Sequence, residues 1–209
     1  MIAIKEMTYS EKLESITSYI KLTEDFALQL VRKELGRAKA DELLSKWKND
    51  SQPVPRDGSD KEKYEVAYKN FMRNWVSANN LMEKYQGEDG GSKFMKAAIS
   101  AYKQKHAGSA RTLRIVGGIS SKAAFKSLAS RLAYDLQVFS PLLISEIGDS
   151  RMVVEAAPCK ILETQVGNDF CRMACRNIIP VWLEEQFNVK MTQERKDESC
   201  SIMFEPFKK

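Results

Sequence analysis

The chain has 209 residues, of which 43% are hydrophobic, and this is enough to bury the core of one large domain. Its 33 Lys and Arg against 28 Asp and Glu give a net charge of +5, and the two signs alternate along the chain, which argues against a nucleic-acid surface. No apolar run approaches the roughly 18 residues of a transmembrane helix, and the pattern of a signal peptide is missing. We therefore expect a cytoplasmic protein that does not enter a membrane and keeps its cysteines reduced, without disulfides.

Helices are predicted for most of residues 1–140. The segment Thr8–Glu11 has the form of a capping box, and the helical pattern that follows it stops at Gly36. A shorter amphipathic helix covers residues 40–47. The polar segment Asn49–Asp60 contains prolines and a glycine, which predicts an exposed loop.

The clearest periodicity belongs to a third helix. Apolar and aromatic residues recur there at steps of four and three, which places them on one helix seam: Tyr64, Tyr68, Phe71, Trp75, Ala78, Met82 and Tyr85. Such a seam is typical of a core or a helix–helix contact, and it also suits the wall of a ligand pocket. Tyr68, Phe71 and Trp75 are therefore candidate ligand-binding residues.

The segment Gln86–Ser92 is predicted to break the helical pattern. It is rich in glycine but lacks the Lys and Ser/Thr of a phosphate-binding loop, so we discard nucleotide binding. A helix begins at Ser92 and ends at Gly108, and Thr112–Val116 is a short β-prone run. A further helix runs from Ser120 to the stop at Pro141.

The last third of the chain predicts a small sheet. Leu142–Glu146 and Met152–Ala156 form one hairpin, and Phe187–Thr192 and Ser201–Phe204 form a second. Between the hairpins, the spacing from Ile161 to Leu183 suits one helix or two.

These elements define an α+β fold in which a helical N-terminal part packs on a C-terminal antiparallel sheet. The helical part covers residues 1–140, and the β-β-α-β-β part covers residues 141–209. We treat the chain as a single domain.

All four cysteines lie in this last part. Cys159 follows a strand and Pro158 and precedes a helical pattern, so its sulfur is expected among the unpaired N–H groups of a helix N-terminus, beside Lys160. That environment lowers the pKa of a thiol. The alternative is a small buried residue at a tight junction.

A metal site is the other use that clustered cysteines permit. Cys171 and Cys175 share a helix face, and Cys200 and His106 are further ligands for zinc. However, no CxxC pair is present, and the same spacing suits a core stripe, so we predict neither a metal nor a cofactor. His106, the sole histidine, sits in a sequence typical of a solvated or helix-capping residue.

A family resemblance rests on three motifs in this region. They are Pro158 with Cys159, then Cys175 with Asn177, and then the run from Cys200 to Phe204, C-S-I-M-F. This order resembles the C-terminal part of the L-2-amino-thiazoline-4-carboxylic acid hydrolase-like family, and Asn177 and Ser201 stand where that family has Asp. The resemblance implies that Cys159, Cys175, Asn177 and Cys200 are catalytic. The same layout also resembles the 4-vinyl-reductase-type domain, a small-molecule-binding module of bacterial and archaeal sensors.

Two functions follow as expectations. The first is a hydrolase of a small cyclic carbon–nitrogen substrate, thiazoline-like or amidine-like, in which Cys159 or a carboxylate-activated water attacks; it predicts a reactive, accessible Cys159 and a closed polar pocket. The second is a non-catalytic binding or sensory module, in which the cysteines and the aromatic seam, with Trp182, surround an apolar or metal-bearing pocket and the thiols are unreactive. A purely structural interaction protein is a third option. The expected partner is a small molecule in both cases, and a homodimer is left open.

Overall fold

The computed structural model describes residues 5–108 and 121–206, and for residues 121–124 it describes the helical backbone alone. The chain divides into two compact units. One comprises Thr8–Ala101, and the other joins the residues up to Met7 to those from Tyr102 onward. The boundary between the units, after Ala101, lies well before the point near Pro141 where helices give way to strands. The expectation of a single domain stays a prediction.

The first unit is built from helices. It contains α1 (Tyr9–Leu35), α2 (Arg37–Asp50) and all but the last turn of α3 (Asp60–Lys105). The predicted capping box is confirmed, because the Glu11 N–H donates to the Thr8 hydroxyl over 3.3 Å and the Thr8 N–H donates to the Glu11 carboxylate over 2.8 Å.

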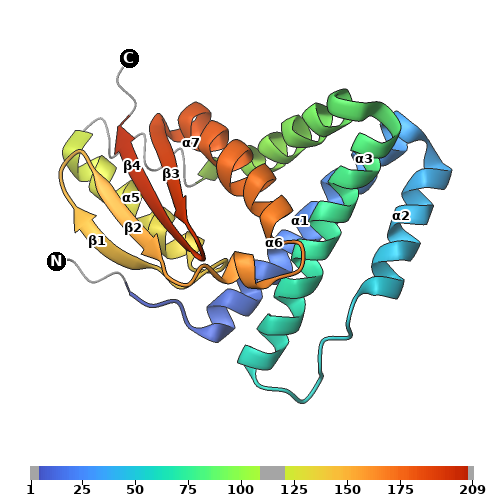
Figure 1. The fold of residues 1–209 in the computed structure, drawn as a ribbon, viewed down its shortest axis with the longest axis horizontal. Coiled ribbons are helices and arrows are strands. Elements are labelled where there is room, and N and C mark those ends of the chain that lie inside the picture. The colour runs from blue at the N-terminus through green and yellow to red at the C-terminus, as the bar shows by residue number, and fades with distance from the viewer. Residues whose placement is uncertain (1–4, 109–120, 207–209) are drawn as a thin grey trace. The chain divides into compact units, whose positions relative to one another are not determined.

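The predicted break at residues 86–92 is confirmed at Gly87, where α3 consists of two helical parts joined across a kink. Only Gly87 leaves helical geometry, at φ 60° and ψ −145°, and the helix changes direction there (Figure 1). Gly90 lies so close to the preceding turns that an added Cβ would stand 2.2 Å from the Met82 carbonyl oxygen. The glycines therefore permit a sharp, closely packed bend between the two helical parts.

The aromatic seam of α3 fills the core of this helical unit. Tyr68, Phe71 and Trp75 are fully buried. Phe94, from beyond the kink, meets Trp75 edge-on with 4.9 Å between ring centroids, and Tyr19 of α1 lies 6.2 Å from Phe71. The core role of the seam is therefore confirmed from Tyr64 to Met82, whereas Tyr85, its last member, is 44% exposed.

The second unit carries the sheet. Helix α5 (Ser121–Leu136) precedes four strands, namely β1 (Leu143–Ile147), β2 (Met152–Ala156), β3 (Val189–Lys196) and β4 (Ser199–Pro206). They form one antiparallel sheet in the order β1-β2-β4-β3, which confirms both predicted hairpins and the α+β fold (Figure 1). The predicted run Thr112–Val116 lies outside the described residues.

The link from β2 to β3 is helical but irregular. A cis Ala157–Pro158 bond leads into the short 3₁₀ helix η1 (Lys160–Glu163). A continuous helical segment follows, with α6 (Gly167–Phe170), the π-helix η2 (Cys171–Ile178) and α7 (Ile179–Phe187). Gly167 permits this start, since an added Cβ there would lie 2.0 Å from the Ile161 carbonyl oxygen.

Across the described parts of the chain, none of the helices combines the length and the apolar character that crossing a membrane requires.

Candidate functional site

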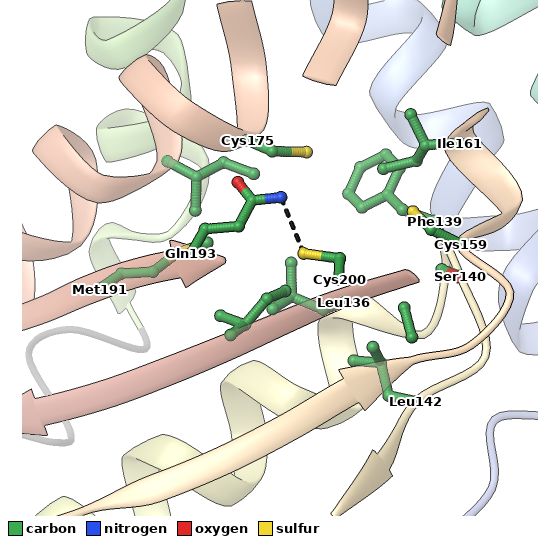
Figure 2. Close-up of a pocket in the computed structure, with 13 residues that line it drawn as sticks. Leu136, Phe139, Ser140, Leu142, Cys159, Ile161, Cys175, Met191, Gln193 and Cys200 are labelled. Atoms are coloured by element: carbon green, nitrogen blue, oxygen red, sulfur yellow. Dashed lines mark hydrogen bonds between the residues drawn. The ribbon is translucent and has the colours of Figure 1, made fainter. Parts of the chain in front are cut away.

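A cavity opens over one face of the sheet, within the sheet-bearing unit. Its walls come from the C-terminal end of α5 and the turn after it, from strands β2, β3 and β4, and from η1, η2 and α7, including Leu136, Phe139, Cys159, Cys175, Met191, Gln193, Cys200 and Ile202 (Figure 2). The space that the centres of water-sized atoms can occupy is about 30 Å³, and the envelope that includes the open mouth is about 410 Å³. None of the described residues that line this cavity carries a carboxylate or an ammonium group.

Strand register explains why these side chains meet. Cys200 lies opposite Ala156 on β2, and Ile202 lies opposite both Val154 on β2 and Gln193 on β3. Residues directly opposite each other in antiparallel strands point to the same face, so the alternation along β4 places Cys200 and Ile202 together toward the helices.

Gln193 is the main polar group in the cavity wall. Its side-chain Nε2 donates to the Cys200 sulfur over 2.8 Å and to the Cys171 sulfur over 3.8 Å. Its Oε1 atom is buried and accepts no hydrogen bond from any residue that the structure describes. Figure 2 shows the carboxamide reaching across the cavity between Cys175 and Cys200. The wall of the cavity therefore contains one buried hydrogen-bond acceptor that has no partner among the described residues.

Cys159 has the predicted backbone donors but not the predicted acidity. It stands before η1, and its sulfur accepts hydrogen bonds from the Ile161 and Leu162 N–H groups and interacts with the Ser140 hydroxyl. Burial outweighs these bonds and raises the pKa of the thiol, which is only 6% exposed. The expected lowering of the Cys159 pKa is thus wrong, because burial of the thiol outweighs the N–H donors of a helix of only four residues.

The most acidic thiol is instead Cys171, which our sequence reasoning treated only as a metal ligand. A hydrogen bond from the Cys175 thiol is the largest cause, and together with the Gln193 amide and the nearby guanidinium groups of Arg176 and Arg195 it lowers the Cys171 pKa to about 6 despite burial. The same bond, with burial, raises the pKa of Cys175 well above its ordinary value. Burial raises the pKa of Cys200 to about 11. The signal in the sequence was the i, i+4 cysteine pair followed by Arg176.

The structure brings together three of the four residues predicted to be catalytic. Cys159, Cys175 and Cys200 all line the cavity. Asn177 does not, because its exposed side chain donates to the Arg172 carbonyl oxygen over 2.7 Å.

The aromatic residues predicted as ligand contacts lie away from this cavity wall. Tyr68, Phe71 and Trp75 belong to the helical unit. Trp182 belongs to the sheet-bearing unit but packs on His106, at 5.0 Å between ring centroids, and on Phe187, at 5.5 Å. None of the four is part of the cavity lining.

All four cysteines are free thiols. In the described residues, no group of three or more His, Cys, Asp or Glu side chains is arranged to hold a metal ion.

No protein-family model and no curated protein matches this sequence. Among solved structures, the chain is similar to a crystal structure of an Fe(II) unliganded H-NOX protein from K. algicida, at 12% identity and a TM-score of 0.37, with 90% of this chain and 96% of that chain covered. A TM-score this low carries no argument about function.

Proposed function

We propose that the sheet-bearing unit is a binding module for a small, largely apolar molecule with one hydrogen-bond donor. The observation that carries this proposal is the buried, unpartnered Gln193 Oε1 in an otherwise apolar wall. A buried acceptor without a partner costs about 1–3 kcal/mol, and a ligand N–H or O–H group would recover much of that cost.

The shape of the cavity limits the ligand. About 30 Å³ of space for atom centres holds little more than two water molecules, since each water needs roughly 10–15 Å³ of such space. A narrow group therefore enters the cavity, while the rest of a larger ligand lies in the mouth. The side chains of Phe139, Met191 and Ile202 supply the apolar contact.

Two features favour a binding module over a hydrolase. Cys159 is buried and its thiol pKa is raised, which weakens it as a nucleophile. Asn177, the second element of the hydrolase-like motif, is exposed and bonded to the backbone of its own helix. A sensory or binding module, as the resemblance to 4-vinyl-reductase-type domains implies, agrees better with an apolar space whose three lining thiols, Cys159, Cys175 and Cys200, all have a raised pKa.

Two isomeric probes test the donor requirement. Butan-1-ol has an O–H donor, whereas diethyl ether contains the same atoms without a donor. Titration of protein labelled with ¹³C in its methionine methyl groups reports the cavity through Met191, which lines it, and reports non-specific effects through Met72, which is buried in the helical unit. We expect butan-1-ol to shift the Met191 signal with about fivefold higher affinity than diethyl ether, as one hydrogen bond of about 1 kcal/mol requires.

The matched variants are Gln193→Leu and Glu194→Leu. Gln193→Leu removes the acceptor and should abolish the preference for butan-1-ol. Glu194 is an exposed neighbour on the same strand, so its variant should keep the preference. A Met191 signal that neither probe moves, or a preference that survives in Gln193→Leu, would refute the proposed function.

A further inference from the structure

The mouth of the cavity has its own chemistry. Most of the lining residues are buried, and the four that are only half-buried mark the part of the lining that reaches the surface: Leu136, Leu142, Ile179 and Gln193. The side-chain oxygen of Gln193 is itself buried, so the surface of the mouth belongs mainly to the three aliphatic side chains. Leu136 ends α5, Leu142 precedes β1 and Ile179 begins α7, and we call these three residues the aliphatic rim.

Two neighbours of the rim are more exposed but point elsewhere. Leu143, 68% exposed, lies opposite Glu155 on β2, whereas Ala156, the next residue of β2, lines the cavity. Successive residues of a strand point to opposite faces, so Leu143 belongs to the far face of the sheet. Val181, 41% exposed, follows Ile179 by two positions, which is about 200° around a helix, and it is not part of the lining. Leu143 and Val181 are therefore matched comparators for the rim.

The size of the interior decides what must cross the rim. Its space of about 30 Å³ holds about two atoms of the size of water, and the donor that meets Gln193 Oε1 uses one of these positions. An interior of two atoms admits the end of a linear chain but not a ring. A polar group at the rim would lose its water without gaining a partner, whereas a methylene group is stabilised by leaving water. The envelope of about 410 Å³ leaves room for an alkyl chain in the mouth.

We propose that the ligand is a linear aliphatic molecule that ends in a hydrogen-bond donor, of the class of the n-alkan-1-ols. The donor lies on Gln193 Oε1, and the chain leaves the cavity across Leu136, Leu142 and Ile179. This inference rests on the proposed function and adds to it the chemical class of the ligand and the residues that select it.

A series of chain lengths tests the rim in the full-length protein. The affinities of butan-1-ol, pentan-1-ol and hexan-1-ol are measured through the methyl signal of Met191, with Met72 of the helical unit as the reference for non-specific effects. Each methylene group that leaves water at the rim should tighten binding about fourfold. Hexan-1-ol should therefore bind about fifteenfold more tightly than butan-1-ol.

Paired variants assign this gain to particular side chains. Leu142→Ala and Ile179→Ala remove rim contacts, and each should reduce the advantage of hexan-1-ol over butan-1-ol to less than about fivefold. Leu143→Ala and Val181→Ala change the neighbouring residues that point away, and both should keep an advantage of about fifteenfold. Each result is a ratio of two affinities for the same variant, so a general loss of affinity or stability cancels.

An advantage near unity in the parent protein would mean that the chain lies in water, and it would overturn the aliphatic rim. A full advantage in Leu142→Ala and Ile179→Ala, or an equal loss in their comparators, would do the same. The preference for butan-1-ol over diethyl ether does not depend on chain length. If that preference is found and hexan-1-ol gains nothing, the proposed function stands and only this inference fails.

Discussion

The Nε2 atom of Gln193 lies 2.8 Å from the sulfur of Cys200, while the Oε1 atom of the same carboxamide is buried without a hydrogen-bond partner in the described structure. The amide nitrogen therefore forms a hydrogen bond within the cavity wall, whereas the amide oxygen has no donor among the described residues. Buried side chains in a stable core usually satisfy both halves. This asymmetry is what we expect of a residue kept for binding and not for stability.

The first prediction compares Gln193 with a buried glutamine that is fully used. Gln186 donates from Nε2 to the Lys103 carbonyl oxygen over 3.0 Å and accepts from the Trp182 indole at Oε1. Gln186→Leu should lower the free energy of unfolding by about 2 kcal/mol, because it leaves two buried polar groups unpaired. Gln193→Leu should change it by less than about 1 kcal/mol, since it also removes the unpaired acceptor.

Urea unfolding of the two variants beside the parent protein measures both changes. An equal loss in the two variants would mean that Gln193 is a structural residue, and the binding argument would lose its basis.

The second prediction concerns the pH at which Cys171 ionises. The Cys171 pKa is lowered to about 6, mainly by the hydrogen bond from Cys175, so the ultraviolet absorbance of a thiolate should appear in a step near that pH. Cys171→Ser should abolish the step. Cys175→Ala, which removes the donor, should move it to higher pH, and Arg176→Gln should move it in the same direction by less.

The step belongs to Cys171 only if it disappears with that residue. A step near pH about 6 that persists in Cys171→Ser would assign the acidic thiol elsewhere.

The predictable parts of the fold are those that short stretches of sequence encode. The capping box at Thr8 and the hairpin between β1 and β2 depend on neighbouring residues, and both appear where the sequence indicates. The break at Gly87 was predictable as well, because glycine marks an end of regular structure in most sequences. The sharpness of the bend was not predictable, because it depends on the close approach of Gly90 to the Met82 carbonyl oxygen.

Several residues of the candidate site could be predicted from the sequence, but their pKa values could not. The sequence pattern and the family resemblance indicated Cys159, Cys175 and Cys200, and these three residues do line one cavity. The sign of the Cys159 pKa shift depends on burial, which a local motif does not encode. Gln193 was missed, because its role comes from the register between β3 and β4.

The third prediction uses two adjacent glycines in α3 as a matched pair. Gly90→Ala would place a Cβ 2.2 Å from the Met82 carbonyl oxygen, which is backbone and cannot move aside. Gly91→Ala would meet only the flexible end of Glu83, at 2.9 Å from Oε1. We expect Gly90→Ala to destabilise the protein by about 1–3 kcal/mol or more, and Gly91→Ala to be neutral or stabilising by up to about 1 kcal/mol, as alanine is the better helix former.

Thermal unfolding of the two variants distinguishes them. Equal midpoints would show that the close approach at Gly90 does not exist.

The last prediction concerns His106, the sole histidine of the chain. Burial, and then the charges of Lys105 and Arg131, lower its pKa to about 4, and its Nε2 is buried with no partner in the described residues. The folded protein therefore keeps the ring neutral, whereas the unfolded chain protonates it below a pKa of about 6.5. Stability should fall as the pH drops from about 6.5 to about 4, because the unfolded state binds the extra proton, and level off below that. Since the residue is partly exposed, we expect the free energy of unfolding to fall by about 1–2 kcal/mol.

The raised pKa of Asp135, caused by burial, acts in the opposite direction, so the histidine contribution must be measured as a difference between two proteins. Urea unfolding of the parent protein and of His106→Gln across this pH range isolates the histidine contribution, and its single ring signal in NMR gives the pKa directly. A ring that titrates near pH 6.5, or a variant with an unchanged pH profile, would contradict the buried neutral state.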